Sequence, residues 1–188
     1  MNSNLAHQEE LRDEMLDGKI VLMSPRPAVN HNRVIGNIFF AFMGYLRGKT
    51  CEPFTDGTDV YLTEKDRVIP DVMIICKKEI IKRKGVFGVP DLIVEVLSPG
   101  TEKRDRGYKK DLYEESGVRE YWLVEPETQT VEVYLLKDKK FVLDDVYRIF
   151  PDYVELSADE QEHYKSEVPV SLYDDFSIPL EDIFRNLF

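Results

Sequence analysis

This chain of 188 residues has few cysteines, no long apolar run and no excess of basic residues. Its two cysteines, Cys51 and Cys76, lie far apart and form no CxxC motif, which excludes a zinc cluster or a disulfide framework; we expect two reduced, buried thiols. No apolar stretch approaches the roughly 20 residues of a membrane-spanning helix, so no membrane partner is expected. Residues 1–14 are polar and acidic and lack the basic start and apolar stretch of a signal peptide, which indicates a cytoplasmic protein.

The net charge of −11 argues at first against a nucleic-acid-binding protein. The acidity is uneven, however, because residues 141–188 carry 12 acidic and 3 basic residues, a net charge of −9. The remaining 140 residues carry 24 acidic and 22 basic residues and are almost neutral. Two basic clusters lie there: Lys77, Lys78, Lys82, Arg83 and Lys84, and then Lys103, Arg104, Arg106, Lys109 and Lys110. Runs of charge are usually solvated surfaces, and that interpretation stays open for both clusters.

The length fits a single domain over residues 1–188, with residues 1–16 forming a short helix or a mobile start. After the Asp17-Gly18 turn, the pattern predicts strands at residues 19–23, 60–62, 67–76, 91–97, 119–124, 130–136 and 141–149. It predicts helices at residues 32–48 and 101–116, the second capped by Thr101 and ended by Gly117. We expect the acidic extension, residues 150–188, to pack on the domain. This order indicates an α/β domain with a mixed sheet.

Glu95 is the first candidate for chemistry, because it lies in the middle of an apolar strand, Asp-Leu-Ile-Val-Glu-Val-Leu. A carboxylate is costly to bury without a partner or a metal ion. Asp71 begins a neighbouring predicted strand, so the two carboxylates can meet at one end of a sheet. Together they form an oxygen site for Mg²⁺, which usually binds one or two carboxylates, water and phosphate.

Phosphodiester cleavage also benefits from a cation near the attacking water or the phosphate. Lys109 lies on the flank of the following helix, at a position that suits a lysine pointing toward the end of the sheet, and Asp105 lies four residues before it on the same face. Lys103, Arg104 and Arg106 are candidate phosphate contacts. An alternative explanation of Glu95 is an ion pair with a basic residue of this helix.

Several runs of the sequence resemble a known family. They are residues 17–25 (DGKIVLMSP), His31, residues 69–75 (IPDVMII), residues 90–109 (PDLIVEVLSP, then KRDRGYK) and residues 112–124 (LYEESGVREYWLV). These runs resemble the Uma-type family of restriction-endonuclease-like proteins, within the PD-(D/E)XK nuclease superfamily. The resemblance covers about residues 17–136.

The resemblance implies a central mixed sheet flanked by helices, with extra hairpin strands, and a metal site at Asp71 and Glu95. Leu97 stands where the superfamily motif has its lysine, and Lys109 matches the position from which this family is thought to supply it. Lys19 stands where relatives often have Glu.

The sequence thus predicts a Mg²⁺-dependent endonuclease acting on DNA, with Mn²⁺ as a substitute ion. Asp71 and Glu95 would hold the ion with the backbone carbonyl of Val96, and Lys109 would orient and activate a water. His31 and Asp91 are accessory candidates; a helix cap and a strand-entry residue are the simpler interpretations of the two.

Two other functions stay open: a non-catalytic nucleic-acid or protein adaptor of the same fold, and a nucleotide phosphohydrolase. A homodimer would suit cleavage of both DNA strands, although no residue demands one.

Overall fold

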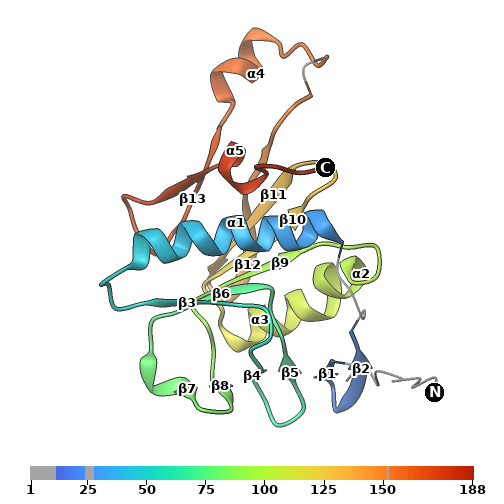
Figure 1. Ribbon diagram of the computed structural model, residues 1–188, viewed down its shortest axis with the longest axis vertical. Helices are drawn as coiled ribbons and strands as arrows, with labels where there is room; N and C mark the ends of the chain where they lie inside the picture. Colours follow the sequence, from blue (N-terminus) through green and yellow to red (C-terminus); the bar gives the residue numbers. More distant parts are fainter. Residues whose placement is uncertain (1–11, 24–27, 152) are drawn as a thin grey trace, which may run out of the picture.

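A six-stranded mixed sheet forms the centre of the protein in the computed structural model, which describes residues 12–23, 28–151 and 153–188 (Figure 1). Its strands β9 and β10 are parallel, and all other neighbours are antiparallel. Their order is β12 (Lys140–Arg148), β11 (Thr130–Lys137), β10 (Glu120–Glu125), β9 (Leu92–Val96), β6 (Val72–Ile75) and β3 (Glu52–Thr55). The predicted mixed-sheet fold is confirmed.

A second sheet of short strands lies beside the first. Their order is β2 (Lys19–Leu22), β1 (Asp13–Leu16), β5 (Arg67–Val68), β4 (Val60–Tyr61), β8 (Gly85–Phe87) and β7 (Ile81–Lys82), with the 3₁₀ turn η1 (Lys78–Ile80) before β7. The single strand predicted at residues 67–76 is therefore wrong, because β5 and β6 belong to different sheets. The segment Ile69-Pro70-Asp71 separates them and carries Asp71 out of regular pairing.

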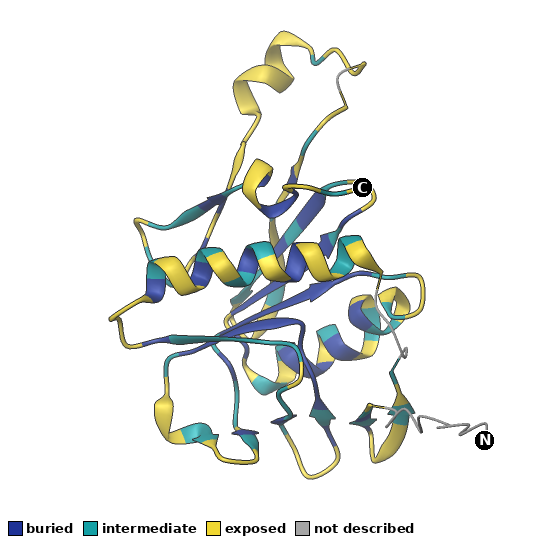
Figure 2. Ribbon diagram, viewed as in Figure 1, coloured by how far each residue is buried: buried dark blue, intermediate teal, exposed yellow. Residues whose placement is uncertain are grey.

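The inner strands β6, β9 and β10 of the central sheet are buried on both faces, as their unbroken apolar runs predict (Figure 2). Successive residues of a strand point to opposite faces, so Leu92, Val94 and Val96 of β9 pack with helix α1 (Val29–Leu46). Ile93 and Leu97 pack on the other side, with helix α3 (Lys110–Ser116) and the second sheet. The same alternation directs Glu95 toward α3.

The segment after β9 is not the single regular helix that was predicted. It consists of α2 (Glu102–Arg104), a π-helical turn η2 (Asp105–Lys109) and α3, with a non-helical Gly107 at φ −110° and ψ −107°. Thr101 is the N-cap residue of α2, as predicted, but its side chain does not cap the helix; its hydroxyl instead pairs with Ser98 Oγ at 3.1 Å. Gly117 ends α3 in the left-handed region, as predicted.

The C-terminal part returns across the α1 side of the sheet. Val168, Val170 and Ile178, together with Leu180 and Ile183, are buried in the α1 core. The elements are β13 (Glu167–Pro169), β14 (Ser177–Pro179) and α5 (Leu180–Ile183). By contrast α4 (Ala158–His163) projects away from the remainder of the protein and buries no residue (Figures 1 and 2).

The two cysteines are bonded to each other. Cys51 and Cys76 form a disulfide with Cα atoms 3.9 Å apart, so the expectation of reduced thiols is wrong. They flank Glu52 and Ile75, which pair across β3 and β6, and this long-range register brings the two sulfurs together.

Residues 13–16, expected in a helix or mobile start, form β1; residues 1–11 lie outside the described part. Within the described ranges, no helix has the length and hydropathy needed to cross a bilayer.

Candidate functional site

Asp71 lies at the entry to β6 and is 8% exposed. Its Oδ2 accepts a hydrogen bond from the amide of Val96 at 2.7 Å and lies 3.5 Å from His31 Nε2. Its backbone carbonyl accepts from the hydroxyl of Thr55 at 3.2 Å and from the amide of Asp56 at 2.9 Å. Because the backbone and the carboxylate are both held, the side chain has a fixed direction.

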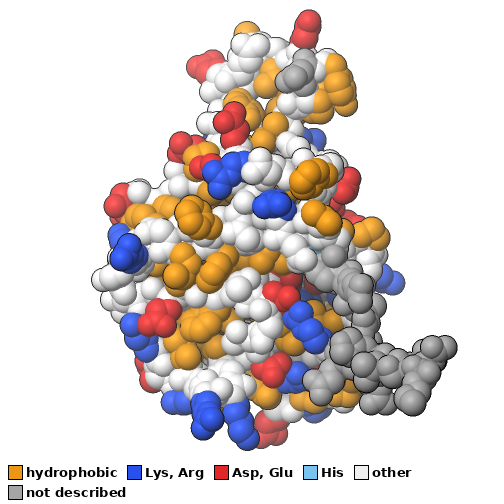
Figure 3. All heavy atoms as spheres, in the orientation of Figure 1, with side chains coloured by type: hydrophobic (Ala, Val, Ile, Leu, Met, Phe, Trp, Pro, Cys, Tyr) orange, Lys and Arg blue, Asp and Glu red, His pale blue; other side chains and the backbone are white. Residues whose placement is uncertain are grey.

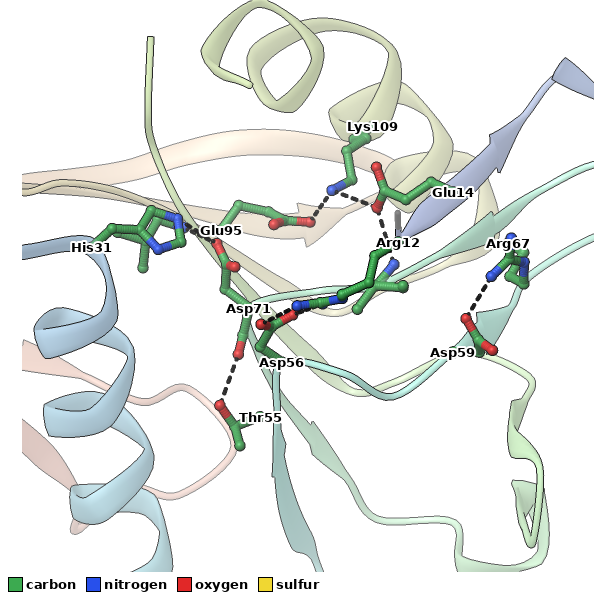
Figure 4. A network of polar contacts seen from close by, with 12 residues as sticks. Arg12, Glu14, His31, Thr55, Asp56, Asp59, Arg67, Asp71, Glu95 and Lys109 are labelled. Atoms are coloured by element: carbon green, nitrogen blue, oxygen red, sulfur yellow. Dashed lines mark hydrogen bonds and ion pairs between the residues drawn. The ribbon is translucent and has the colours of Figure 1, made fainter. Parts of the chain in front are cut away.

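Glu95 projects from the middle of β9 and is 3% exposed. Its Oε1 accepts a hydrogen bond from the hydroxyl of Tyr113 at 2.7 Å and pairs with Lys109 Nζ at 2.7 Å. Both partners come from the helical segment that follows β9, so the carboxylate of Glu95 lies on the face of the central sheet that α3 covers (Figure 4).

Lys109 was expected on a flank between core and solvent, and the structure buries it to 4% exposure. Its ammonium group lies 2.7 Å from Glu95, 3.1 Å from Glu14 and 3.5 Å from Asp105. The pair with Asp105 has the predicted i, i+4 spacing. Lys109 is the last residue of the π-helical turn, and such turns frequently occur at functional sites because they redirect a side chain within a helix.

Glu14 is the site residue that the sequence analysis missed. It lies on β1, is 2% exposed, and accepts a hydrogen bond from the amide of Ile69 at 3.0 Å. The only sequence signal is an alternation, since Glu14 and Leu16 point inward while Asp13 and Met15 are half-buried. Because the preceding residues are polar and acidic, the sequence alone predicts that Glu14 is exposed.

His31 joins the site from the first turn of α1, where the carboxylate of Asp71 faces its Nε2 (Figure 4). Its Nδ1 is buried without a hydrogen-bond partner among the described residues. The helix-cap interpretation is wrong, because the N-cap residue is Ala28 and no side chain caps this helix.

Burial and crowding set the ionisation of the cluster. Burial raises the pKa of Asp71 to about 6, against the opposing effect of His31. Burial likewise raises the pKa of Glu95 well above its ordinary value, although Lys109 lowers it. For Lys109, burial would lower the pKa, but Glu95, Glu14 and Asp105 outweigh it and hold the pKa well above its ordinary value. Lys109 is therefore held as an ammonium ion beside the carboxyl group of Glu95.

These side chains line one cavity of about 280 Å³. Its wall also contains residues 98–101, which follow β9, together with Arg104. Arg12 and Asp56 lie at the same cavity and form an ion pair, with Arg12 Nη1 2.8 Å from Asp56 Oδ2. The cavity thus has a carboxylate-rich floor and two arginines on its wall.

Other predicted residues lie elsewhere. Asp91 accepts from the amide of Cys76 at 2.8 Å and lies outside the cavity wall, in agreement with a strand-entry role. Arg106 pairs with Glu102 at 3.0 Å and with Glu132 at 2.7 Å, which directs its guanidinium away from the cavity. Lys103 is exposed and outside the wall, so of the three candidate phosphate contacts only Arg104 lines the cavity.

Lys19 is also outside the cavity wall, exposed next to Asp17 on the β1–β2 hairpin. Lys19 therefore contributes no side chain to the observed cluster.

The donor set fits a hard divalent cation. Three buried carboxylates, those of Glu14, Glu95 and Asp105, lie within 3.5 Å of the one ammonium group of Lys109, and the buried carboxylate of Asp71 lines the same cavity, so acidic groups outnumber this cation. Carboxylate oxygens are the ligands that Mg²⁺ prefers, with water and phosphate completing its coordination. In the described ranges, no group of three or more His, Cys, Asp or Glu side chains is arranged to hold a metal ion, so the metal site at Asp71 and Glu95 stays a prediction. Val96 presents its amide to Asp71, and its carbonyl remains a predicted ligand.

Comparisons with known proteins agree with this fold. The uncharacterized protein slr1290 of Synechocystis sp. is 30% identical over 129 residues, which cover 68% of this chain and 67% of that protein. The crystal structure of a putative nuclease belonging to DUF820 from Anabaena variabilis superposes with a TM-score of 0.70 at 19% identity, covering 93% of this chain and 90% of that chain.

The family model for Uma2, described as "Putative restriction endonuclease", matches residues 3–165, most of the chain and all the site residues named above. The chain therefore belongs to the Uma2 family of restriction-endonuclease-like proteins.

Proposed function

We propose that this protein is a metal-dependent endonuclease that hydrolyses phosphodiester bonds in DNA. The observation that carries the proposal is the meeting of two buried carboxylates, Asp71 and Glu95, with the ammonium group of Lys109 in one cavity. Membership of the Uma2 family and the nuclease-like fold support it.

Asp71 and Glu95 would hold Mg²⁺ or Mn²⁺. When bound there, such an ion would lower the pKa of a coordinated water and offset negative charge on the phosphoryl group. The two carboxylates are rigidly placed, because Asp71 is tied to the amide of Val96 and Glu95 to the hydroxyl of Tyr113. Because the two carboxylates are buried, the effective dielectric constant around them is low and charge interactions there are stronger than in water.

Lys109 acts as a cation, not as a base. Its three carboxylate neighbours keep it protonated, so it donates hydrogen bonds to the attacking water or to a phosphate oxygen. Of its predicted role, orienting and activating a water, the proposal therefore keeps the orienting part. Arg104 lines the cavity wall and would contact a phosphate that flanks the scissile bond.

A second candidate function is a non-catalytic adaptor. The direct contact of Glu95 and Lys109 at 2.7 Å favours it, because this is the ion pair that would neutralise Glu95 without any metal. The two functions differ in their need for a divalent cation: the nuclease requires the ion for cleavage, whereas the adaptor binds its partner without it.

The test combines calorimetric titration of Mg²⁺ and Mn²⁺ with cleavage of plasmid DNA, single-stranded DNA and mononucleotides. We expect Glu95→Gln and Asp71→Asn to lose metal binding and to cut on the order of 100-fold more slowly or worse. Asp91→Asn is the matched control, since Asp91 adjoins the same strand but lies outside the cavity. Unchanged cleavage by the two site variants would refute the proposal. Metal-independent DNA binding without cleavage would favour the adaptor, and a preference for mononucleotides would indicate a phosphohydrolase.

A further inference from the structure

The segment of residues 153–164, which we call the arm, buries no residue, although its C-terminal end shares a pocket with β12. Each of these residues is exposed except Leu156, which is half-buried, and Tyr153 is 85% exposed. Its helix α4 has only six residues, yet it begins with a complete capping box between Ser157 and Glu160. Helices this short are marginal without tertiary packing, so a capped but unpacked helix indicates a partner outside the arm's own chain.

The arm combines apolar and acidic side chains. Tyr153, Val154 and Tyr164 are exposed, and the ring centroid of Tyr164 lies 6.1 Å from that of Phe150. The acidic residues of the arm are Glu155, Asp159, Glu160 and Glu162. The complementary surface is therefore apolar and basic.

Such a surface exists between the C-terminal half of α1 and β3. This groove, of about 740 Å³, contains Phe40, Met43, Pro53 and Phe54, and the glycines Gly44 and Gly48 widen it. Phe40 is 71% exposed and Met43 47% exposed. Residues 34–46 include no charged residue, so the solvent face of this part of α1 lacks the charges that usually cover a surface helix.

Basic residues surround the apolar centre of the groove. Arg47, Lys49 and Lys78 line it with a single acid, Glu52, which pairs with Lys78 at 2.7 Å. Figure 3 shows the arm projecting from one end of the molecule, while apolar side chains gather over its middle. Among the described residues, no hydrogen bond or ion pair joins the arm to the groove of its own chain, and no arm residue lines that groove, so an arm that occupies it would come from another copy.

We propose that the protein forms a two-fold dimer in which the acidic, aromatic arm of each copy docks in the α1–β3 groove of the other. The contact is reciprocal, so it closes at two copies and excludes further addition. Apolar burial supplies its affinity, and opposite charges set its orientation and make it salt-dependent.

The test uses the full chain in sedimentation velocity over a range of concentrations. The wild type is expected at about 44 kDa, twice the chain mass of 22.0 kDa. An arm variant (Tyr153→Ser with Tyr164→Ser) and a groove variant (Phe40→Ser with Met43→Ser) are each expected to dimerise about tenfold more weakly or worse. The substituted side chains are largely exposed, and unchanged circular dichroism would verify folding.

Mixing the two variants gives the decisive result. A mixed dimer retains one intact contact, between the wild-type arm of the groove variant and the wild-type groove of the arm variant, so dimers should return in the mixture. Val142→Ser with Leu143→Ser is the matched control, because these residues are 43% and 46% exposed on the edge strand β12, outside both surfaces. A monomeric wild type, no recovery on mixing, or loss of the dimer only in the β12 control would each overturn the proposal.

Discussion

Replacing Lys109 by Met tests how much of the folding stability depends on one buried ammonium group. The substitution keeps the length of the side chain but leaves Glu95, Glu14 and Asp105 without the cation that lies 2.7, 3.1 and 3.5 Å from them. Removing one partner of a buried ion pair costs about 3–5 kcal/mol. We expect a loss of this size at pH 8.

The loss should shrink at low pH. Lys109 stays protonated between pH 5 and 8, since its neighbours raise its pKa above the ordinary value, so the pH dependence comes from the carboxylates. Without the ammonium group the pKa of Glu95, already raised by burial, rises further. A raised carboxyl pKa favours the protonated folded state, so the variant is most stable at pH 5 and loses stability as the pH rises.

Urea unfolding, followed by the fluorescence of the buried Trp122 at pH 5 and pH 8, measures both effects. Lys103→Met is the matched control, because Lys103 is exposed on the same helical segment, and it should cost less than about 0.5 kcal/mol. A loss for Lys109→Met below about 1 kcal/mol at pH 8, or an equal loss at both pH values, would refute the reasoning.

Three further substitutions have defined outcomes. Glu120 is fully buried, and burial raises its pKa from 4.5 to about 7, so ionising it should cost the wild type up to about 3 kcal/mol of stability between pH 4.5 and 7.5. The Glu120→Gln variant should lack that part of the slope in thermal unfolding, and an unchanged slope would contradict this. Cys51→Ser with Cys76→Ser opens a loop of 25 residues and should lower the unfolding free energy by about 2–4 kcal/mol, while adding reductant should affect the wild type alone. Glu14→Gln should lower the apparent pKa of Lys109 in a chemical-modification profile, whereas an unaltered profile would show that Glu14 does not act on Lys109.

Local patterns in the sequence are enough to locate the helices and strands whose residues are neighbours in the chain. The apolar periodicity located α1, β9 and the β10–β11 hairpin within a few residues, because packing on the core requires that spacing. Glu95 stood out for the same reason, as a carboxylate in an otherwise apolar strand. Asp71 and Lys109 were identified through motifs that surround them in the chain.

Tertiary structure decided which charged residues meet. Glu14 reaches Lys109 only because β1 belongs to the second sheet, and Arg106 turns away because Glu132 of β11 binds it. The disulfide likewise follows from the pairing of β3 with β6. Sequence periodicity indicates which residues face the core. The pairing between distant strands depends on the free energy of the whole fold, so it cannot be predicted from a local pattern.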